Sequence, residues 1–145
     1  MGFLNSMNIS GSALTAQRLR MDVIAENIAN ANTTRTATGQ PYRRRLVLFG
    51  ERNAKLPFSD YLSTAQSAVG KGVRVTQIIE DESPMKIMYD PSHPDCDENG
   101  YVRMPNVDTV KEMIDMMSAT RSYEANVTAI NAFKNMAMKS FDIGK

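Results

Sequence analysis

Cysteine, histidine and tryptophan are almost absent from this sequence, which has one Cys, one His and no Trp in 145 residues. Because Cys96 is alone, no intrachain disulfide can form. A tetrahedral zinc site is also excluded, since no second Cys or His exists to join Cys96 and His93. His93 is the only histidine that could act as the base for a Cys96 nucleophile, and it lies in the same proline-rich loop, which is a poor position for catalysis. The sequence therefore predicts no enzymatic activity, no small-molecule substrate, no cofactor and no metal centre.

Long apolar runs are missing as well. The longest, such as residues 46–49, fall far short of the roughly 18 residues that indicate a membrane span. No Lys or Arg precedes Arg18, and polar residues interrupt the first apolar stretch, so a cleavable secretory signal is not predicted. We expect no direct membrane insertion, and an export route without signal cleavage if the protein leaves the cytoplasm.

The formal net charge is only +1, yet the charges are unevenly distributed. Residues 1–75 contain ten Lys or Arg and four Asp or Glu, whereas residues 76–108 contain two and eight. This pattern favours head-to-tail contact between identical units over binding of a polyanion, which prefers an unopposed basic surface.

The C-terminal stretch, residues 107–142, has apolar residues at alternating spacings of three and four, which indicates one face of a long helix. A spacing near 3.5 keeps such a face turned toward a second helix along its whole length. At about 1.5 Å per residue, this helix would be too long to bury its own stripe within a domain of this size. The positions are Met113, Met116, Thr120, Tyr123, Val127, Ile130, Lys134, Ala137 and Phe141.

The N-terminal stretch shows the same spacing, with Arg18 as its one charged position. We therefore expect the two terminal helices to pair with each other and with copies in neighbouring subunits. The residues predicted to form this assembly interface are Leu4, Met7, Gly11, Leu14, Met21, Ala25, Ile28, Met113, Met116, Tyr123, Val127, Ile130 and Phe141. Ile130→Asp is expected to abolish assembly while the middle of the chain stays folded.

The middle of the chain is predicted to be β-rich. Strands are expected at residues 42–49, 72–79 and 85–89, the last two forming a hairpin. Residues 90–106 contain three prolines and are predicted to be an ordered extended loop, and residues 51–72 a flexible one. Asn106 or Asp108 is expected to cap the second helix, and Gly144 to end it.

The predicted fold is therefore mainly α. Two long terminal helices form a coiled-coil-like antiparallel pair, with a small β-rich hairpin insert between them. The expected parts are an N-terminal helix at residues 1–34, the insert at 35–106 and a C-terminal helix at 107–145.

An acidic segment resembles half of a calcium-binding loop. Asp95, Asp97, Asn99 and Gly100 match positions 1, 3, 5 and 6 of such a loop, but position 12, which should be a bidentate Glu, is Asn106. A calcium-responsive or other ligand-binding module at residues 95–106 stays open as the alternative function.

Three consecutive arginines, at residues 43–45, form the strongest basic run. In a strand, neighbouring side chains point to opposite faces, so the three would not make one patch for nucleic acid. We expect them to protect a strand edge or to contact acidic residues 80–98 of another copy.

Several segments carry a family resemblance. The sequence QRLRMDVIAENIANANTT at residues 17–34 resembles the N-terminal signature of the bacterial flagellar axial proteins of the rod and hook. Residues 41–45, 89–95, 100–107 and 121–127 are similar to rod members of this family, and the likeness covers nearly the whole chain except residues 51–72.

This resemblance implies a structural subunit of the flagellar basal-body rod, without catalysis, in a shaft that crosses the periplasm and cell wall. It implies export through the flagellar type III apparatus. The implied partners are further copies of the chain, other rod proteins and the export-gate adaptor, and neither nucleic acid nor a membrane.

Overall fold

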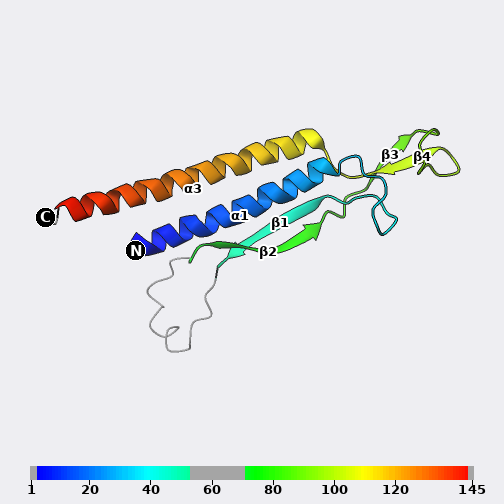
Figure 1. Cartoon of the computed structure of the whole chain (residues 1–145). Coiled ribbons are helices and arrows are strands. Elements are labelled where there is room, and N and C mark those ends of the chain that lie inside the picture. Colours follow the sequence, from blue (N-terminus) through cyan, green and yellow to red (C-terminus); the bar gives the residue numbers. More distant parts are fainter. Residues whose placement is uncertain (1–2, 53–70, 144–145) are drawn as a thin grey trace, which may run out of the picture.

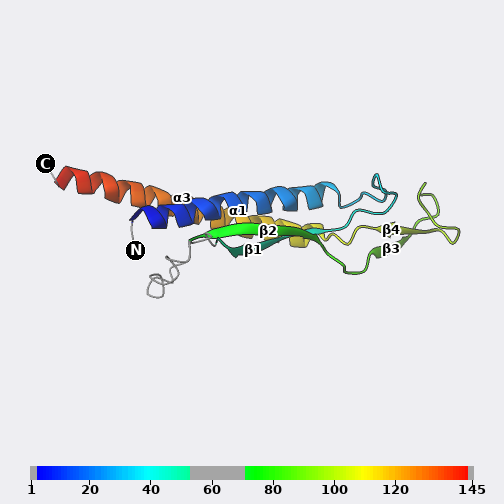
Figure 2. The ribbon, with the colours of Figure 1, turned by 90° about the horizontal axis from the view of Figure 1, so that it is seen from below.

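Two long helices dominate the computed structural model, which describes residues 3–52 and 71–143. Helix α1 comprises Phe3–Ala29 and helix α3 comprises Thr109–Ile143. They lie side by side and antiparallel, with both chain termini at one end of the molecule (Figure 1). Helix α3 is the longer and extends past the first turn of α1 (Figures 1 and 2). The molecule is consequently elongated along the helix axes.

Two separate antiparallel ribbons lie between the helices in sequence. Strands β1, Arg45–Glu51, and β2, Val73–Glu80, form the first ribbon, which packs along α1. Strands β3, Lys86–Tyr89, and β4, Tyr101–Met104, form the second. This second ribbon projects beyond the helices at the end opposite the termini (Figures 1 and 2). The expectation of two long terminal helices with a small β-rich part between them is confirmed, and this part consists of two antiparallel strand pairs.

The helix ends follow local side-chain chemistry. Asn30 donates its side-chain amide to the Glu26 carbonyl at 3.0 Å, and the chain turns away from α1 after Ala29. At the start of α3, Asp108 Oδ1 accepts from the backbone N–H of Val110 at 3.0 Å, which is an N-cap. Of the two predicted capping residues, Asp108 is correct. The alternative of Asn106 is wrong, because its side chain instead binds the backbone of Arg44 and Asp81, which flank the paired ends of β1 and β2.

The predicted strand positions were nearly right, but the predicted pairing was wrong. β2 pairs with β1, from Arg45 opposite Glu80 to Glu51 opposite Val73, and not with β3. The backbone N–H of Asp81 extends this ladder by donating to the Arg44 carbonyl at 2.8 Å. The two strands are of matching length, so their pairing uses backbone groups that a short β3 would leave unpaired.

The prediction that residues 90–106 lack regular structure was also wrong. Tyr101–Met104 forms β4 and pairs with β3, Tyr101 lying opposite Tyr89. Gly100 makes the turn into β4 with a φ of 78°, a conformation that favours glycine. A Cβ at this position would also lie 3.0 Å from the Tyr89 ring. The predicted loop at residues 51–72 falls mostly on residues 53–70, and the stop at Gly144 also lies outside the described residues.

The buried core is small and partly polar. Its apolar members include Ala16, Val23, Ile24 and Ala119, which are small or medium in size. Among the largest fully buried side chains are Glu112 and Asn27. Apolar burial alone therefore gives this fold limited stability, and buried hydrogen bonds assume a larger role.

One buried acceptor in α1 lacks a hydrogen-bond partner within the described part of the chain. The Gln17 Oε1 atom is buried without a hydrogen bond among the described residues. Such an atom costs about 1–3 kcal/mol, because it loses water and gains nothing. We expect Gln17→Leu to raise the free energy of unfolding by about 1 kcal/mol in urea denaturation. The exposed Gln77→Leu is the control, and a Gln17→Leu variant no more stable than that control would contradict the prediction.

Candidate functional site and assembly surfaces

Asn27 lies at the centre of a buried polar cluster at the end of α1. It is 1% exposed. Both N–H groups of its side-chain amide donate hydrogen bonds, and its side-chain oxygen accepts two. Nδ2 donates to the Arg45 carbonyl at 2.9 Å and to Glu112 Oε2 at 3.0 Å. Oδ1 accepts from the Tyr42 hydroxyl and from the Arg45 backbone N–H, each at 2.9 Å. One amide thus joins α1, the start of β1 and α3.

Glu112 carries a buried charge in the first turn of α3, and its side chain is 1% exposed. Its Oε1 atom accepts from Arg44 Nε at 2.6 Å, and the Arg44 side chain is itself only 12% exposed. The same guanidinium reaches Asp115 at 3.2 Å and Asp81 at 3.7 Å. All four groups belong to one chain, so Arg44 contacts the acidic segment, through Asp81, within its own subunit. Protection of a strand edge, or contact of residues 43–45 with another copy, stays a prediction.

Neighbouring groups hold this cluster in place. The Arg44 backbone N–H donates to Asn106 Oδ1 at 2.8 Å, and Asn106 Nδ2 donates to the Asp81 carbonyl at 3.0 Å. Hydrogen bonds from Ser83 lower the pKa of the Asp81 carboxyl, and the nearby Arg44 guanidinium also contributes. Burial, aided by the Glu26 carboxylate, raises the pKa of Tyr42, which keeps its hydroxyl a donor to Asn27. We call Asn27, Tyr42, Arg44, Asn106 and Glu112 the polar lock.

Sequence reasoning missed the polar lock. A signal was present, since Glu112 continues the spacing of three and four through Met116 and Ala119. A charged residue on a covered helix face requires a buried partner. The sequence could not show that the partner was Arg44.

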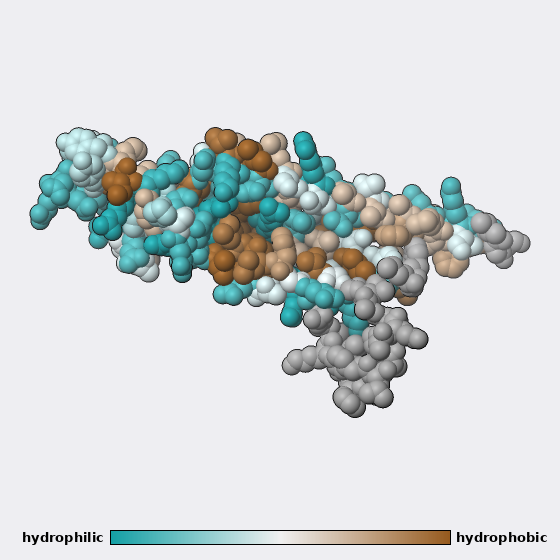
Figure 3. Space-filling view, turned by 180° about the vertical axis from the view of Figure 1, so that it is seen from behind, coloured by the Kyte–Doolittle hydropathy of each residue, from teal (hydrophilic) through white to brown (hydrophobic). Residues whose placement is uncertain are grey.

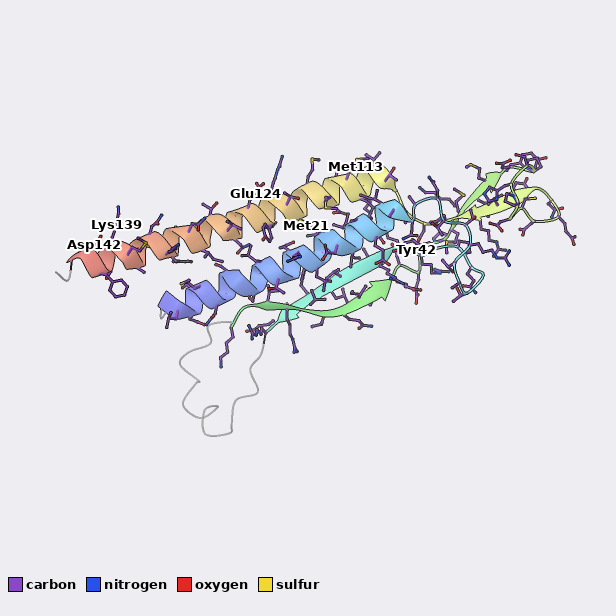
Figure 4. All side chains as sticks on the ribbon, in the orientation of Figure 1. Met21, Tyr42, Met113, Glu124, Lys139 and Asp142 are labelled. Carbon is purple, nitrogen blue, oxygen red and sulfur yellow. The ribbon has the colours of Figure 1, made fainter. Side chains whose placement is uncertain are left out.

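An exposed apolar stripe runs along the beginning of α3, on its outer side. Val110, Met113, Ile114 and Met117 are 52–62% exposed and follow helical spacing. We call these residues the outer stripe. The space-filling view shows an apolar area over the beginning of α3 and another over the β1–β2 ribbon (Figure 3). Met113 lies on the side of α3 away from α1, whereas Met21 lies between the helices (Figure 4).

The opposite end of α3 is also apolar and exposed. Met136 and Met138 are 54% and 56% exposed, and Phe141 is 78% exposed. Leu4, at the start of α1 near the same end, is 73% exposed. Exposed apolar side chains of this size, spread over both terminal helices, are candidates for contact with other molecules.

None of the predicted assembly residues is buried within the subunit. Those that are exposed are Leu4, Ala25, Met113 and Phe141. Those that are partly covered are Met7, Gly11, Leu14, Met21, Ile28, Met116, Tyr123, Val127 and Ile130. Contacts between α1 and α3 leave much of this apolar area accessible, which Met21 illustrates by lying 3.6 Å from the Thr120 hydroxyl without being buried.

The carboxylate of Asp95, the first residue of the acidic loop, binds side chains of the segment that follows α1. Asp95 Oδ2 accepts from the Thr34 hydroxyl at 2.8 Å, and Oδ1 lies 3.7 Å from Arg35 Nη1. Across residues 3–52 and 71–143, no group of three or more His, Cys, Asp and Glu side chains is arranged to hold a metal ion. The ligand-binding alternative therefore has no support in the structure.

The two helices are not membrane spans. In the described part of the chain, neither helix combines the length and the apolar character needed to cross a bilayer.

Comparisons with known proteins match both ends of the chain to flagellar families. Residues 7–35 match the family described as "Flagella basal body rod protein", and residues 98–143 match "Flagellar basal body rod FlgEFG protein C-terminal". These two matches contain most of α1 and α3.

Complete relatives cover nearly the whole chain. The flagellar basal-body rod protein FlgC of Bacillus subtilis (strain 168) is 50% identical over 148 residues, 97% of each chain. FlgC of Borreliella burgdorferi is 51% identical over 94% of this chain and 93% of its own length, and that of Escherichia coli O6:H1 is 43% identical over 100% of both. The chain therefore belongs to the FlgC family of flagellar basal-body rod proteins.

Proposed function

We propose that this chain self-assembles through its terminal helices into a helical shaft that transmits torque. The observation that carries the proposal is the accessibility of apolar residues along both helices, from Leu4 on α1 to Phe141 on α3. Side chains of this kind gain stability when a neighbouring subunit covers them, at about 25 cal/mol per Å² of apolar area. Contacts between different surfaces of identical subunits produce an open helical array unless they close into a ring.

A coiled-coil-like pairing of α1 and α3 is part of this proposal. The covered and partly covered positions of α3 include a series that alternates spacings of three and four, as in the seam of a coiled coil. This series consists of Glu112, Met116, Ala119, Tyr123, Asn126, Ile130, Phe133 and Ala137. The division into an N-terminal helix at 1–34, an insert at 35–106 and a C-terminal helix at 107–145 follows from the same reasoning. In this division, the two helices form the shaft and the insert is attached to it.

The proposed partners are further copies of the chain and other rod proteins. We also assign to this chain the family's export-gate adaptor as a partner, export without signal cleavage, and a place in the rod across the periplasm and cell wall. The names of the relatives support a structural role in the flagellum, and catalysis has no part in it.

A charged substitution in the outer stripe tests whether this surface takes part in assembly. We expect Met113→Asp to reduce swimming several-fold in a bacterium that lacks its own homologue, because a carboxylate would lose solvation at a covered apolar surface. Met113 is 52% exposed in the subunit, so the purified variant should unfold at the same urea concentration as the wild type.

Lys111→Asp is the matched control, since Lys111 is an exposed polar residue on the same helical turn. It should swim normally. Equal swimming of the Met113→Asp and Lys111→Asp strains would exclude the outer stripe from the assembly surface.

A further inference from the structure

The projecting β3–β4 ribbon exposes large apolar and aromatic side chains on one of its faces. Side chains alternate along a strand, so Ile87 and Tyr89 share a face with their cross-strand partners Arg103 and Tyr101. Ile87, Tyr89 and Tyr101 are 70%, 65% and 46% exposed, and Arg103 on the same face is exposed as well. On the other face, Val102 is 2% exposed and its partner Met88 is 50% exposed. The Tyr89 and Tyr101 rings meet edge to face at 5.3 Å and so form one rigid aromatic surface.

The ribbon belongs to the acidic part of the molecule. Its turn carries Asp97 and Glu98, both exposed, and residues 76–108 contain eight acidic and two basic residues. Asp90 follows Tyr89 directly, and hydrogen bonds from Ser92 lower the pKa of its carboxyl. The ribbon thus combines exposed aromatic area with negative charge.

A groove of complementary character lies in the other half of the molecule, between α1 and β2. It has a volume of about 340 Å³. Ala16, Leu19, Val73 and Val75 make up its apolar lining, which we call the floor, and Arg52 and Arg74 also line it. Both arginines are exposed, and neither takes part in an ion pair within residues 3–52 and 71–143.

We infer that the β3–β4 ribbon of one copy docks into the α1–β2 groove of the next. This contact rests on the proposed function and names the surfaces that make it directional. Ile87 and Tyr89 would cover the apolar floor, and Asp97 and Glu98 would lie against Arg52 and Arg74. The ribbon and the groove lie in opposite halves of an elongated molecule, so the contact joins copies head to tail and leaves one ribbon and one groove free at the ends.

The charge distribution favours a second copy as the occupant. The acidic ribbon of one copy and the basic groove of another copy attract each other. Two ribbons, or two grooves, would repel each other. A two-stranded ribbon is also marginally stable by itself, which a covered face would correct.

Disulfide crosslinking tests the contact between purified proteins. Cys96 is first replaced by Ser, which leaves no other cysteine. One protein then carries Ile87→Cys on the ribbon, and the second carries Thr15→Cys on the groove wall. Mild oxidation of the mixture should yield a disulfide-linked dimer. The control replaces Thr15→Cys with Ser118→Cys, an exposed position on α3 that does not line the groove, and should give several-fold less dimer.

A charge reversal with rescue supplies the second measurement. Arg74→Glu in the groove protein should reduce the dimer yield several-fold, and Glu98→Arg in the ribbon protein should restore it. A random collision would show neither effect. A dimer yield equal to that of the Ser118→Cys control would overturn the contact, as would indifference to the charge reversal.

A further experiment separates this inference from the proposed function. The Ile87→Cys and Thr15→Cys proteins are co-expressed in a bacterium that lacks its own homologue, and swimming and crosslinking are both measured. Normal swimming without the Ile87–Thr15 crosslink would overturn the head-to-tail contact and leave the rod role intact. A crosslink in the purified mixture with no incorporation into rods would overturn the rod role and leave the contact intact.

Discussion

Glu112→Ala should lower the free energy of unfolding by about 3–5 kcal/mol, which is a large part of the stability of a small protein. The Arg44 guanidinium would remain 12% exposed with its shortest ion pair, the 2.6 Å contact to Glu112, removed. Asn27 Nδ2 would also lose one of its two acceptors. The measurement is urea denaturation followed by far-ultraviolet circular dichroism, with the midpoint and the slope both fitted.

Glu124→Ala is the control for this substitution, because Glu124 is an exposed acidic residue on the same helix. Its unfolding free energy should stay within about 0.5 kcal/mol of the wild type. A double variant, Arg44→Met with Glu112→Leu, should be more stable than Glu112→Ala, since it leaves no buried charge unpaired. Equal stability of Glu112→Ala and Glu124→Ala would show that the Arg44–Glu112 pair contributes nothing to the fold.

The terminal helices could be predicted closely from sequence because each signal was local. Apolar spacing of three and four persisted over many turns, and polar side chains marked the ends. Phe3–Ala29 and Thr109–Ile143 agree with the expected limits to within a few residues. The Asp108 cap needs only the next two or three backbone N–H groups, which are present wherever a helix begins there.

The strand pairing could not be predicted because it depends on residues distant in sequence. Arg45 pairs with Glu80 across a long connection, whereas the predicted hairpin needed only the short turn at residues 80–84. Sequence proximity favoured the hairpin, since a short loop closes at a smaller entropic cost. In the fold, Asn106 binds both Arg44 and Asp81, which holds the end of the β1–β2 ribbon and directs the chain away from it.

The helix face that packs within the subunit also differs from the predicted stripe. On α3, Met116, Tyr123 and Ile130 belong to both, but Glu112 and Ala119 are buried where Met113 and Thr120 were expected. A shift of one residue rotates a helix by about 100°, which turns Met113 outward. The periodicity therefore revealed a long apolar face, but it could not say which part packs within the subunit.

The polar lock and the outward position of the outer stripe are connected. The polar lock fixes α1, β1 and α3 to one another at one end of the helices through hydrogen bonds and ion pairs, which have strict geometry. It therefore orients the subunit while using little apolar surface. The outer stripe, Leu4 and Phe141 remain accessible for neighbouring molecules.

Ile130→Asp should abolish rod assembly and swimming while the polar lock and both ribbons stay folded. Ile130 is half-covered on the face of α3 shared by the predicted and the observed stripe. A carboxylate there would have to lose water wherever a helix covers it, at a cost of several kcal/mol. Glu112 lies about 27 Å away along the helix, so the direct effect on the polar lock should be small.

The measurements are swimming in soft agar, the amount of the variant in isolated basal bodies, and limited proteolysis of the purified protein. Asn131→Asp is the matched control, because it places the same charge on the exposed side of the same turn and should assemble normally. Incorporation of Ile130→Asp at the level of Asn131→Asp would show that this part of α3 makes no apolar contact in the shaft. Loss of assembly together with protease-sensitive ribbons would instead place the effect on the fold of the subunit, because the lock would then depend on helix pairing far from it.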